Sequence, residues 1–168
     1  MITVVTGNKH KAAEVAAFFS GITEVTHVAF DCIEPQADSV EEIARAKAEQ
    51  AYAALGVPLI VDDTGLFIDA LSGFPGPFAA YVQDTIGNAG VLRLMEGRER
   101  RSAHFATAVA YADADGIRVF SGRVDGTITT AERKASTTIL SLLWAQRHLP
   151  SGSEEIRTPD LRRVKATS

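Results

Sequence analysis

In the first third of the chain, segments with the apolar pattern of a strand alternate with segments with that of a helix. Residues 2–6 form a short β-branched run, which predicts a buried strand. Residues 12, 15, 16 and 19 are apolar at helical spacing, so a helix is expected next. Residues 25–30 predict a second strand. A capping box at Ser39 then begins a long alanine-rich helix that ends at Gly56.

The middle of the chain adds a third strand, a further helix and a hairpin. Residues 58–61 predict the third strand, which runs into the acidic segment 62–65, and residues 66–71 are expected to continue as a strand or a short turn. Residues 85–96 predict a helix weakened by two internal glycines. Residues 103–111 alternate with period two, and a tight turn leads into a strand at residues 117–121. Because strands and helices alternate early and a hairpin comes late, the pattern predicts an α/β domain with a mixed central sheet and flanking helices.

Composition narrows the function classes. The 168 residues are 46% apolar and 23% charged, which suits one compact domain. A net charge of -4 gives no general attraction to nucleic acid or to an anionic membrane. No apolar run approaches the roughly 20 residues that span a bilayer, and the start has no signal-peptide pattern. One cysteine excludes an intrachain disulfide framework. We therefore expect a cytoplasmic protein with neither a nucleic-acid nor a membrane partner.

The junction between the first strand and the first helix is the first candidate site. It consists of Thr6, Gly7, Asn8, Lys9, His10 and Lys11. At a helix start, free backbone N–H groups and the positive end of the helix dipole favour a phosphate. Asn8 can cap the helix, Gly7 lets a ligand approach the backbone, and Lys11 lies in the first turn. The spacing is not that of a P-loop, and the segment alone also fits an ordinary capped helix with solvated lysines.

Two adjacent carboxylates form the second candidate site, and a further carboxylate that could complete a metal site, Glu34, is the third. Asp62 and Asp63 follow an apolar strand, at the end where open α/β sheets bind ligands. Side chains alternate along a strand, so the two carboxylates are expected to point in different directions. Glu34 lies in the loop before the second helix. Oxygen ligands of this kind suit Mg²⁺, although local turn bonding and a solvated loop glutamate are the alternatives.

These segments together resemble the inosine triphosphate pyrophosphatase family. The resemblance runs in order from residue 1 to about 130 and rests on residues 6–11, Glu34, and residues 62–66, 69–81 and 101–105. The Gly-Phe-Pro-Gly-Pro sequence within residues 69–81 distinguishes it from a related family that acts on modified pyrimidines.

The resemblance implies two lobes around a deep cleft, usually in a homodimer, and a reaction that requires Mg²⁺. Members cleave a nucleoside triphosphate between the α- and β-phosphates, giving the monophosphate and pyrophosphate, and prefer ITP, dITP and XTP. By the same resemblance, residues 6–11 would cradle the triphosphate. Glu34 and Asp63 would hold Mg²⁺, Asp63 would also deprotonate the attacking water, and Thr64 would bond the substrate. Asp62 would support them.

Residues 133–168 do not match this family. The Phe-Gly-Tyr-Asp-Pro, Phe-Ala-Glu-Met and Ser-His-Arg segments that build the family's base pocket are absent from the sequence. Residues 1–132 hold ten Lys/Arg and eighteen Asp/Glu, a net of -8, whereas residues 133–168 hold seven and three, a net of +4. We therefore expect an incomplete pyrophosphatase domain, residues 1–132, and a partly disordered segment, residues 133–168. That segment reflects either divergence or a change of reading frame, and the charge inversion favours the second.

Three functions follow for the sequence. The first is hydrolysis of non-standard purine triphosphates, impaired by the altered C-terminal segment. The second is nucleotide binding by the same fold without turnover. The third is a truncated product without a selected function.

Overall fold

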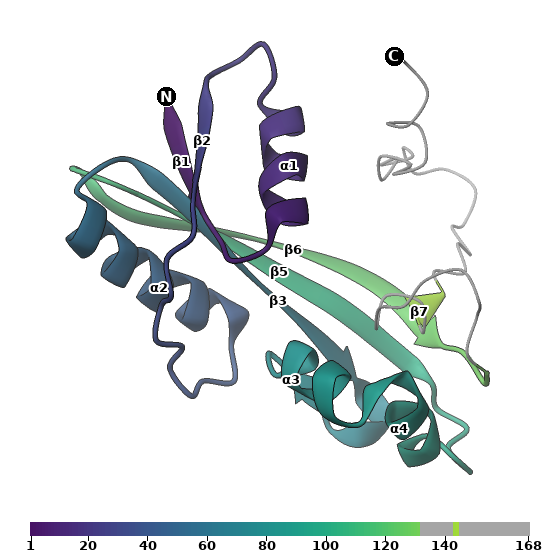
Figure 1. Ribbon diagram of the computed structural model, residues 1–168. Helices are drawn as coiled ribbons and strands as arrows, with labels where there is room; N and C mark the ends of the chain where they lie inside the picture. Colours follow the sequence, from purple (N-terminus) through teal and green to yellow (C-terminus); the bar gives the residue numbers. More distant parts are fainter. Residues whose placement is uncertain (132–142, 145–168) are drawn as a thin grey trace, which may run out of the picture.

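A mixed β-sheet forms the centre of the computed structural model, which describes residues 1–131 and 143–144 (Figure 1). The strand order is β2-β1-β3-β5-β6-β7, and β4 pairs with β3 off this path. β1 is parallel to β2 and β3, whereas β3, β5 and β6 are successively antiparallel. The predicted α/β fold with a mixed central sheet and flanking helices is confirmed.

The bounds of the elements are as follows. The strands are β1 (Ile2–Val5), β2 (Val25–Val28), β3 (Leu59–Ile68), β4 (Pro75–Gly76), β5 (Ser102–Asp113), β6 (Gly116–Ile128) and β7 (Leu143–Trp144). The helices are α1 (Lys9–Phe18), α2 (Val40–Leu55), α3 (Ala79–Thr85) and α4 (Gly87–Leu94), with a 3-10 helix, η1 (Asp69–Leu71). The second strand is thus two residues shorter than the predicted 25–30.

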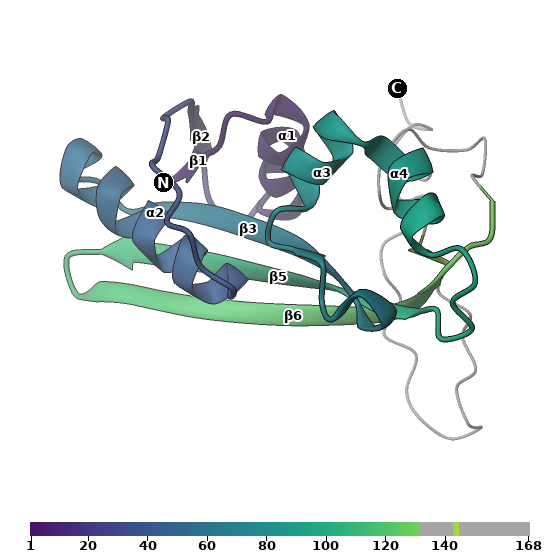
Figure 2. The same ribbon diagram turned by 90° about the horizontal axis from the view of Figure 1, so that it is seen from below.

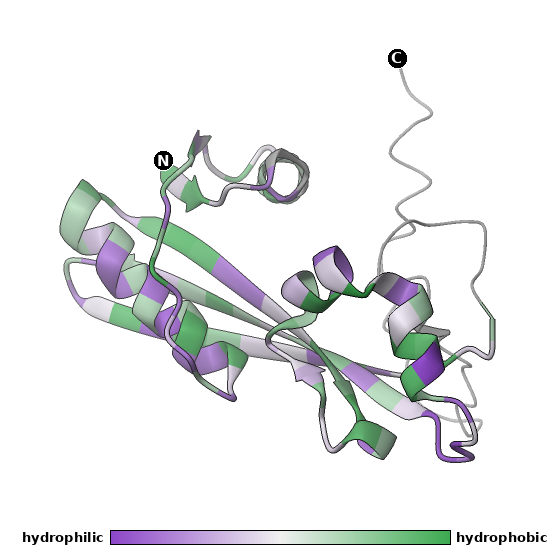
Figure 3. Ribbon diagram, turned by 60° about the horizontal axis from the view of Figure 1, so that its bottom comes forward, coloured by the Kyte–Doolittle hydropathy of each residue, from purple (hydrophilic) through white to green (hydrophobic). Residues whose placement is uncertain are grey.

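Strand β3 corrects one prediction that matters for the site. We expected the carboxyl end of the strand at the acidic pair, with a strand or short turn over residues 66–71, but β3 continues unbroken through the pair to Ile68. Its partner β5 pairs with it residue by residue, from Leu59 opposite Ala112 to Ile68 opposite Ala103. This non-local ladder overrides the local turn preference of the acidic segment. Figure 3 shows the result as a hydrophilic band in the middle of an otherwise hydrophobic β3.

The other edge of β3 is open at this hydrophilic band. β1 pairs with β3 only at Leu59 and Ile60, and β4 pairs with it only at Leu66 and Phe67. Residues 61–65 therefore have a β-partner on one side only among the described residues. An unpaired strand edge exposes backbone polar groups to which a ligand can bind.

Two hydrophobic clusters lie toward opposite ends of the long strands. Leu59 and Val61 pack with α2 in one cluster, whereas Leu66 and Ile68 pack with α3 and α4 in the other. Side chains alternate along a strand, so these odd- and even-numbered residues lie on opposite faces of the sheet. Figure 2 shows α2 near one end of the sheet and the α3–α4 pair near the other. This arrangement agrees with the expected two lobes.

Helix α2 forms as the sequence predicts. Ser39 caps its start, where the Oγ accepts a hydrogen bond from the backbone N–H of Glu42 at 3.4 Å. Gly56 ends it with a left-handed φ of 65°, a conformation that glycine adopts without a side-chain clash. Its buried stripe includes Ala44 and Ala48, whose small side chains let the helix lie close to the alanines of β5.

The region between η1 and β5 differs in part from its prediction. The helix predicted over residues 85–96 is the shorter α4, and a further helix, α3, precedes it. Ile86 separates the two helices, and Gly87, the first residue of α4, has a φ of 61°. The hairpin that joins β5 to β6 is confirmed, and both strands are longer than predicted.

The segment 133–168 lies outside the described residues except for β7, which pairs with the end of β6. Within the described residues, no helix is long and apolar enough to cross a membrane.

Candidate active site

The turn between β1 and α1 is fixed by its own side chains. The Thr6 Oγ1 accepts a hydrogen bond from the backbone N–H of Asn8 at 3.1 Å, and the Asn8 Oδ1 accepts one from the backbone N–H of Lys11 at 3.4 Å. Asn8 therefore caps α1, as predicted. Gly7 is exposed at the start of this helix. Lys9 and His10 begin α1, and their side chains lie outside the described part of the chain.

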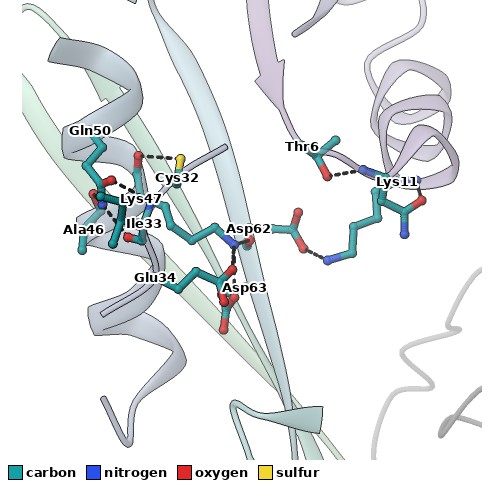
Figure 4. Close-up of polar contacts among 11 residues, drawn as sticks. Thr6, Lys11, Cys32, Ile33, Glu34, Ala46, Lys47, Gln50, Asp62 and Asp63 are labelled. Carbon is teal, nitrogen blue, oxygen red and sulfur yellow. Dashed lines mark hydrogen bonds and ion pairs between the residues drawn. The ribbon is translucent and has the colours of Figure 1, made fainter. Parts of the chain in front are cut away.

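The two adjacent aspartates of β3 point in different directions, as predicted (Figure 4). The Asp62 carboxylate forms an ion pair with the Lys11 ammonium of α1. The Asp63 carboxylate turns toward α2, where its Oδ1 lies 3.3 Å from the Lys47 Nζ. The pair stands within β3, beyond the carboxyl end of the shorter β1, and not at the end of its own strand.

Lys47 brings the distant carboxylates together. Its Nζ lies 2.8 Å from the Glu34 Oε1 and 3.3 Å from the Asp63 Oδ1, and it donates to the backbone carbonyl of Asp62 at 3.3 Å. Glu34 and Asp63, far apart in the sequence, therefore converge on one ammonium group (Figure 4). Because Lys11 reaches Asp62, the neighbour of Asp63 on β3, the predicted carboxylates and the predicted lysine belong to one site.

Sequence reasoning missed Lys47, although the sequence contains a signal for it. The buried stripe of α2 consists of Val40, Ile43, Ala44, Ala48 and Ala51. A lysine at position 47 lies at helical spacing within this stripe, three or four residues from Ile43, Ala44 and Ala51. A lysine on the buried face of a helix needs an anionic partner.

Burial and charge compete at the Asp63–Lys47 pair. Burial raises the pKa of Asp63 to about 6, although the charge and hydrogen bond of Lys47 lower it in part. Burial by itself lowers the pKa of Lys47, but the hydrogen bond to Glu34 and the charges of Asp63 and Glu34 raise it above its ordinary value. The lysine is therefore protonated, and Asp63 is a carboxylate that can accept a proton near neutral pH.

A cavity of about 370 Å³ lies between these groups. Its wall includes Thr6, Gly7, Asn8, Lys11, Glu34, Lys47 and Asp62. Asp63 is only 9% exposed and is not among the wall residues, but it contacts Lys47, which is one of them. Thr64 is not among the described wall residues, and its Oγ1 forms a hydrogen bond with the Oγ1 of Thr107 on β5 at 2.9 Å. Its role as a substrate ligand stays a prediction.

The carboxylates of Glu34 and Asp63 suit a hard cation whose remaining ligands are oxygens of water or phosphate. The Oδ2 of Asp63 is buried and meets no donor among the described residues, so it has capacity for a further partner. No group of three or more His, Cys, Asp or Glu side chains in the described residues is arranged to hold a metal. Glu34 and Asp63 alone fit Mg²⁺, which commonly binds one or two carboxylates and completes its shell with water and phosphate oxygens.

Comparisons with known proteins agree with this arrangement. Residues 2–138 match the Ham1 family. The dITP/XTP pyrophosphatase of Methanopyrus kandleri is 48% identical over 128 residues, which are 76% of this chain and 67% of that protein. The enzyme of the same name from Methanothermobacter marburgensis is 49% identical over 135 residues, which are 79% and 71%.

A solved structure extends the agreement to the fold. The Ham1 protein of Coxiella burnetii superposes with a TM-score of 0.75 at 25% identity, covering 84% of this chain and 80% of that one. The resemblance noted over residues 1 to about 130 is thus confirmed. The chain is a member of the Ham1 family.

Proposed function

We propose that this chain is a Mg²⁺-dependent pyrophosphatase that hydrolyses non-standard purine nucleoside triphosphates, ITP, dITP and XTP, to the monophosphate and pyrophosphate. The observation that carries the proposal is the convergence of Glu34 and Asp63 on Lys47 beside the cavity that Lys11 also lines. The names of the relatives from Methanopyrus kandleri and Methanothermobacter marburgensis support the substrate class.

The polyphosphate binds between two cationic elements in this proposal. The first turn of α1 offers backbone N–H groups and the positive end of a ten-residue helix. Lys11 and Lys47 add ammonium groups on either side of the open edge of β3. Each lysine is already held by a carboxylate of β3, so little side-chain entropy is lost when phosphate oxygens arrive.

Asp63 acts as the general base. Cleavage consumes one water molecule, whose oxygen forms a bond to one of the two phosphorus atoms that the bridging oxygen joins. The bond between that phosphorus and the bridging oxygen breaks, and the bridging oxygen leaves with the electron pair. The water proton passes to the Asp63 carboxylate, whose pKa of about 6 leaves it mostly ionised at pH 7. Glu34 and Asp63 would hold a divalent cation, which would supply positive charge against the charge that develops on the phosphate oxygens.

The alternative, a nucleotide-binding protein without turnover, is not favoured. The relatives of this chain are named as pyrophosphatases, and Asp63 has a buried carboxylate with a raised pKa. The homodimer expected from the resemblance and the cytoplasmic location expected from the composition stay predictions. Light scattering of the purified chain checks the first, and cell fractionation checks the second.

Incubation of the purified chain with ITP or GTP and Mg²⁺ tests the proposal. We expect pyrophosphate as the phosphorus product, faster release from ITP than from GTP, and no detectable release by Asp63→Asn. Release of orthophosphate alone contradicts cleavage between the α- and β-phosphates. Protection from thermal unfolding by ITP without any product supports the binding protein instead.

A further inference from the structure

Gln50 binds both hydrogen-bonding groups of one backbone residue in the loop that carries Glu34. Its Oε1 accepts a hydrogen bond from the backbone N–H of Ile33 at 2.8 Å, and its Nε2 donates to the carbonyl oxygen of Ile33 at 2.7 Å (Figure 4). The Nε2 also donates to the carbonyl of Ala46 at 3.2 Å, which anchors the amide on its own helix. Two residues of neighbouring antiparallel strands exchange hydrogen bonds in the same paired way.

The residues on either side of Ile33 contact the same turn of α2. The Cys32 Sγ donates to the backbone carbonyl of Lys47 at 3.5 Å, and the Glu34 Oε1 accepts from the Lys47 Nζ at 2.8 Å. Cys32 and Glu34 line the cavity, whereas Ile33 is 80% exposed. Successive side chains of an extended segment point to opposite sides, so fixing the backbone of Ile33 directs both neighbours toward the cavity.

The loop depends on such side-chain bonds for its conformation. Residues 29–39 connect β2 to α2 and form neither helix nor strand. A segment without a backbone ladder has many accessible conformations, and each side-chain bond to a rigid helix removes some of them. The two bonds of Gln50 act directly on the residue before Glu34.

We propose that Gln50 is a positioning residue for the metal site: it fixes the backbone of Ile33 and so sets the Glu34 carboxylate beside that of Asp63. The inference rests on the proposed function, because a divalent cation shared by two carboxylates requires them at a fixed separation. Gln50 lies behind the loop and is not among the described wall residues of the cavity, so it acts through Glu34 and not on the substrate.

Gln50→Met is the informative variant, because methionine has a similar length and helix preference but cannot form the paired hydrogen bonds. We expect the Mg²⁺ concentration that half-saturates pyrophosphate release to rise about ten-fold or more. The kcat and the KM for ITP at saturating Mg²⁺ stay within about two-fold of the wild type, a split that general loss of structure does not produce. Glu49→Met changes an exposed neighbour on α2 and is expected to leave all three values unchanged.

Two measurements are independent of turnover. Hydrogen exchange at the Ile33 amide should accelerate in Gln50→Met, and Mn²⁺ binding followed by electron paramagnetic resonance should weaken by the same factor as the Mg²⁺ dependence. Gln50→Glu, which retains the acceptor for the Ile33 N–H but not the donor, should give intermediate values and serves if Gln50→Met does not fold.

The outcomes separate the two proposals. Faster exchange at Ile33 with unchanged metal affinity overturns the positioning role. Metal binding by the wild-type chain without pyrophosphate release overturns the proposed function, while the Mn²⁺ titration of Gln50→Met still decides the role of Gln50. Absence of any metal binding by the wild-type chain overturns the positioning role and the metal part of the proposed function together.

Discussion

Asp62 and Asp63 are neighbours on β3, yet they hold lysines from two different helices. Asp62 pairs with Lys11 of α1, and Asp63 contacts Lys47 of α2. Strand alternation turns the two carboxylates to opposite sides, so the two ammonium groups approach the open edge of β3 from opposite directions. One dipeptide thereby places two cations on either side of the position that we propose for the polyphosphate.

Lys47 and Lys11 differ in burial and in the number of carboxylates that they contact. The Lys47 side chain is 17% exposed and contacts two carboxylates, whereas that of Lys11 is 39% exposed and pairs with one. Removal of one partner from a buried charge cluster leaves the others unpaired, so Lys47→Met should reduce kcat/KM for ITP by about 100-fold or more. Lys11→Met should act mainly on KM and by a smaller factor. Steady-state kinetics at saturating Mg²⁺ compares them, and equal losses contradict the asymmetry.

Lys47 also marks how far the sequence alone could predict the site. Asp63 and the strand-to-helix turn could be found because acidic residues after an apolar strand and a glycine before a helix are recognisable locally. Glu34, a lone loop glutamate, received its role from the family resemblance. Lys47 was missed because a lysine in an alanine-rich helix is usually solvated. Its partners come from a loop and from β3, and only the tertiary structure brings them within reach.

The end of the third strand was mispredicted for a related reason. The segment Asp62–Gly65 has strong turn propensity, and no local feature reveals that β5 pairs with all of β3. The long helix α2, by contrast, was predicted well because its caps at Ser39 and Gly56 are local signals. Non-local pairing, and not weak propensity, therefore separates the outcomes for these two elements.

Metal removal is expected to abolish activity without unfolding the protein. Glu34 and Asp63 are already held by Lys47, so the fold does not depend on a cation to bring them together. EDTA should therefore eliminate pyrophosphate release and leave the thermal midpoint of the nucleotide-free chain within about 2 °C. It should also remove the stabilisation that ITP gives with Mg²⁺, since a ligand stabilises only in proportion to its binding. A large fall in the midpoint on chelation alone contradicts this account.

The pH dependence of activity should follow Asp63. Its pKa of about 6 predicts that kcat/KM, measured at subsaturating Mg²⁺, falls about ten-fold for each pH unit below 6, because the protonated carboxyl group cannot act as a base. Lys47 lowers the pKa of Asp63, so Lys47→Met should move the acidic limb to higher pH. Asp62→Asn should leave the acidic limb in place. A limb that shifts in Asp62→Asn contradicts the assignment of Asp63 as the base.

The free energy of unfolding should depend on pH in the opposite sense from activity: activity falls as the pH decreases, whereas the contribution of Asp63 to stability rises. The pKa of this carboxyl group is raised in the folded state from 3.8 to about 6, so the folded state binds its proton more tightly than the unfolded state. Its favourable contribution is fully present below pH 3.8 and is lost as pH rises through 6. The shift corresponds to about 3 kcal/mol at most.

Asp63→Asn should consequently be inactive but no less stable than the wild type at pH 7.5, because a neutral amide lacks the desolvation penalty of the carboxylate. Thermal unfolding of both proteins between pH 4 and 7.5 checks this, and any advantage of the variant should shrink as the pH falls. A variant that is markedly less stable at pH 7.5 would show that the Asp63–Lys47 attraction outweighs burial.

Gly7 and Gly65 lack side chains for different reasons, and alanine at each position separates fold from ligand binding. A Cβ at Gly65 would stand 2.8 Å from the carbonyl oxygen of Gly76 on β4 and 2.8 Å from the Phe67 ring, so Gly65→Ala should destabilise the fold by about 1–3 kcal/mol. A Cβ at Gly7 meets no atom of the described residues within 4 Å, so the thermal midpoint of Gly7→Ala should not change.

The added methyl group of Gly7→Ala nevertheless enters the space through which a phosphate approaches the start of α1. We expect the KM for ITP to rise about ten-fold, a loss of binding that ordinary van der Waals obstruction can produce. An unchanged KM, with the fold intact, would mean that the polyphosphate does not lie on this turn. The triphosphate would then have to bind through Lys11 and Lys47 alone, without the backbone N–H groups of the helix.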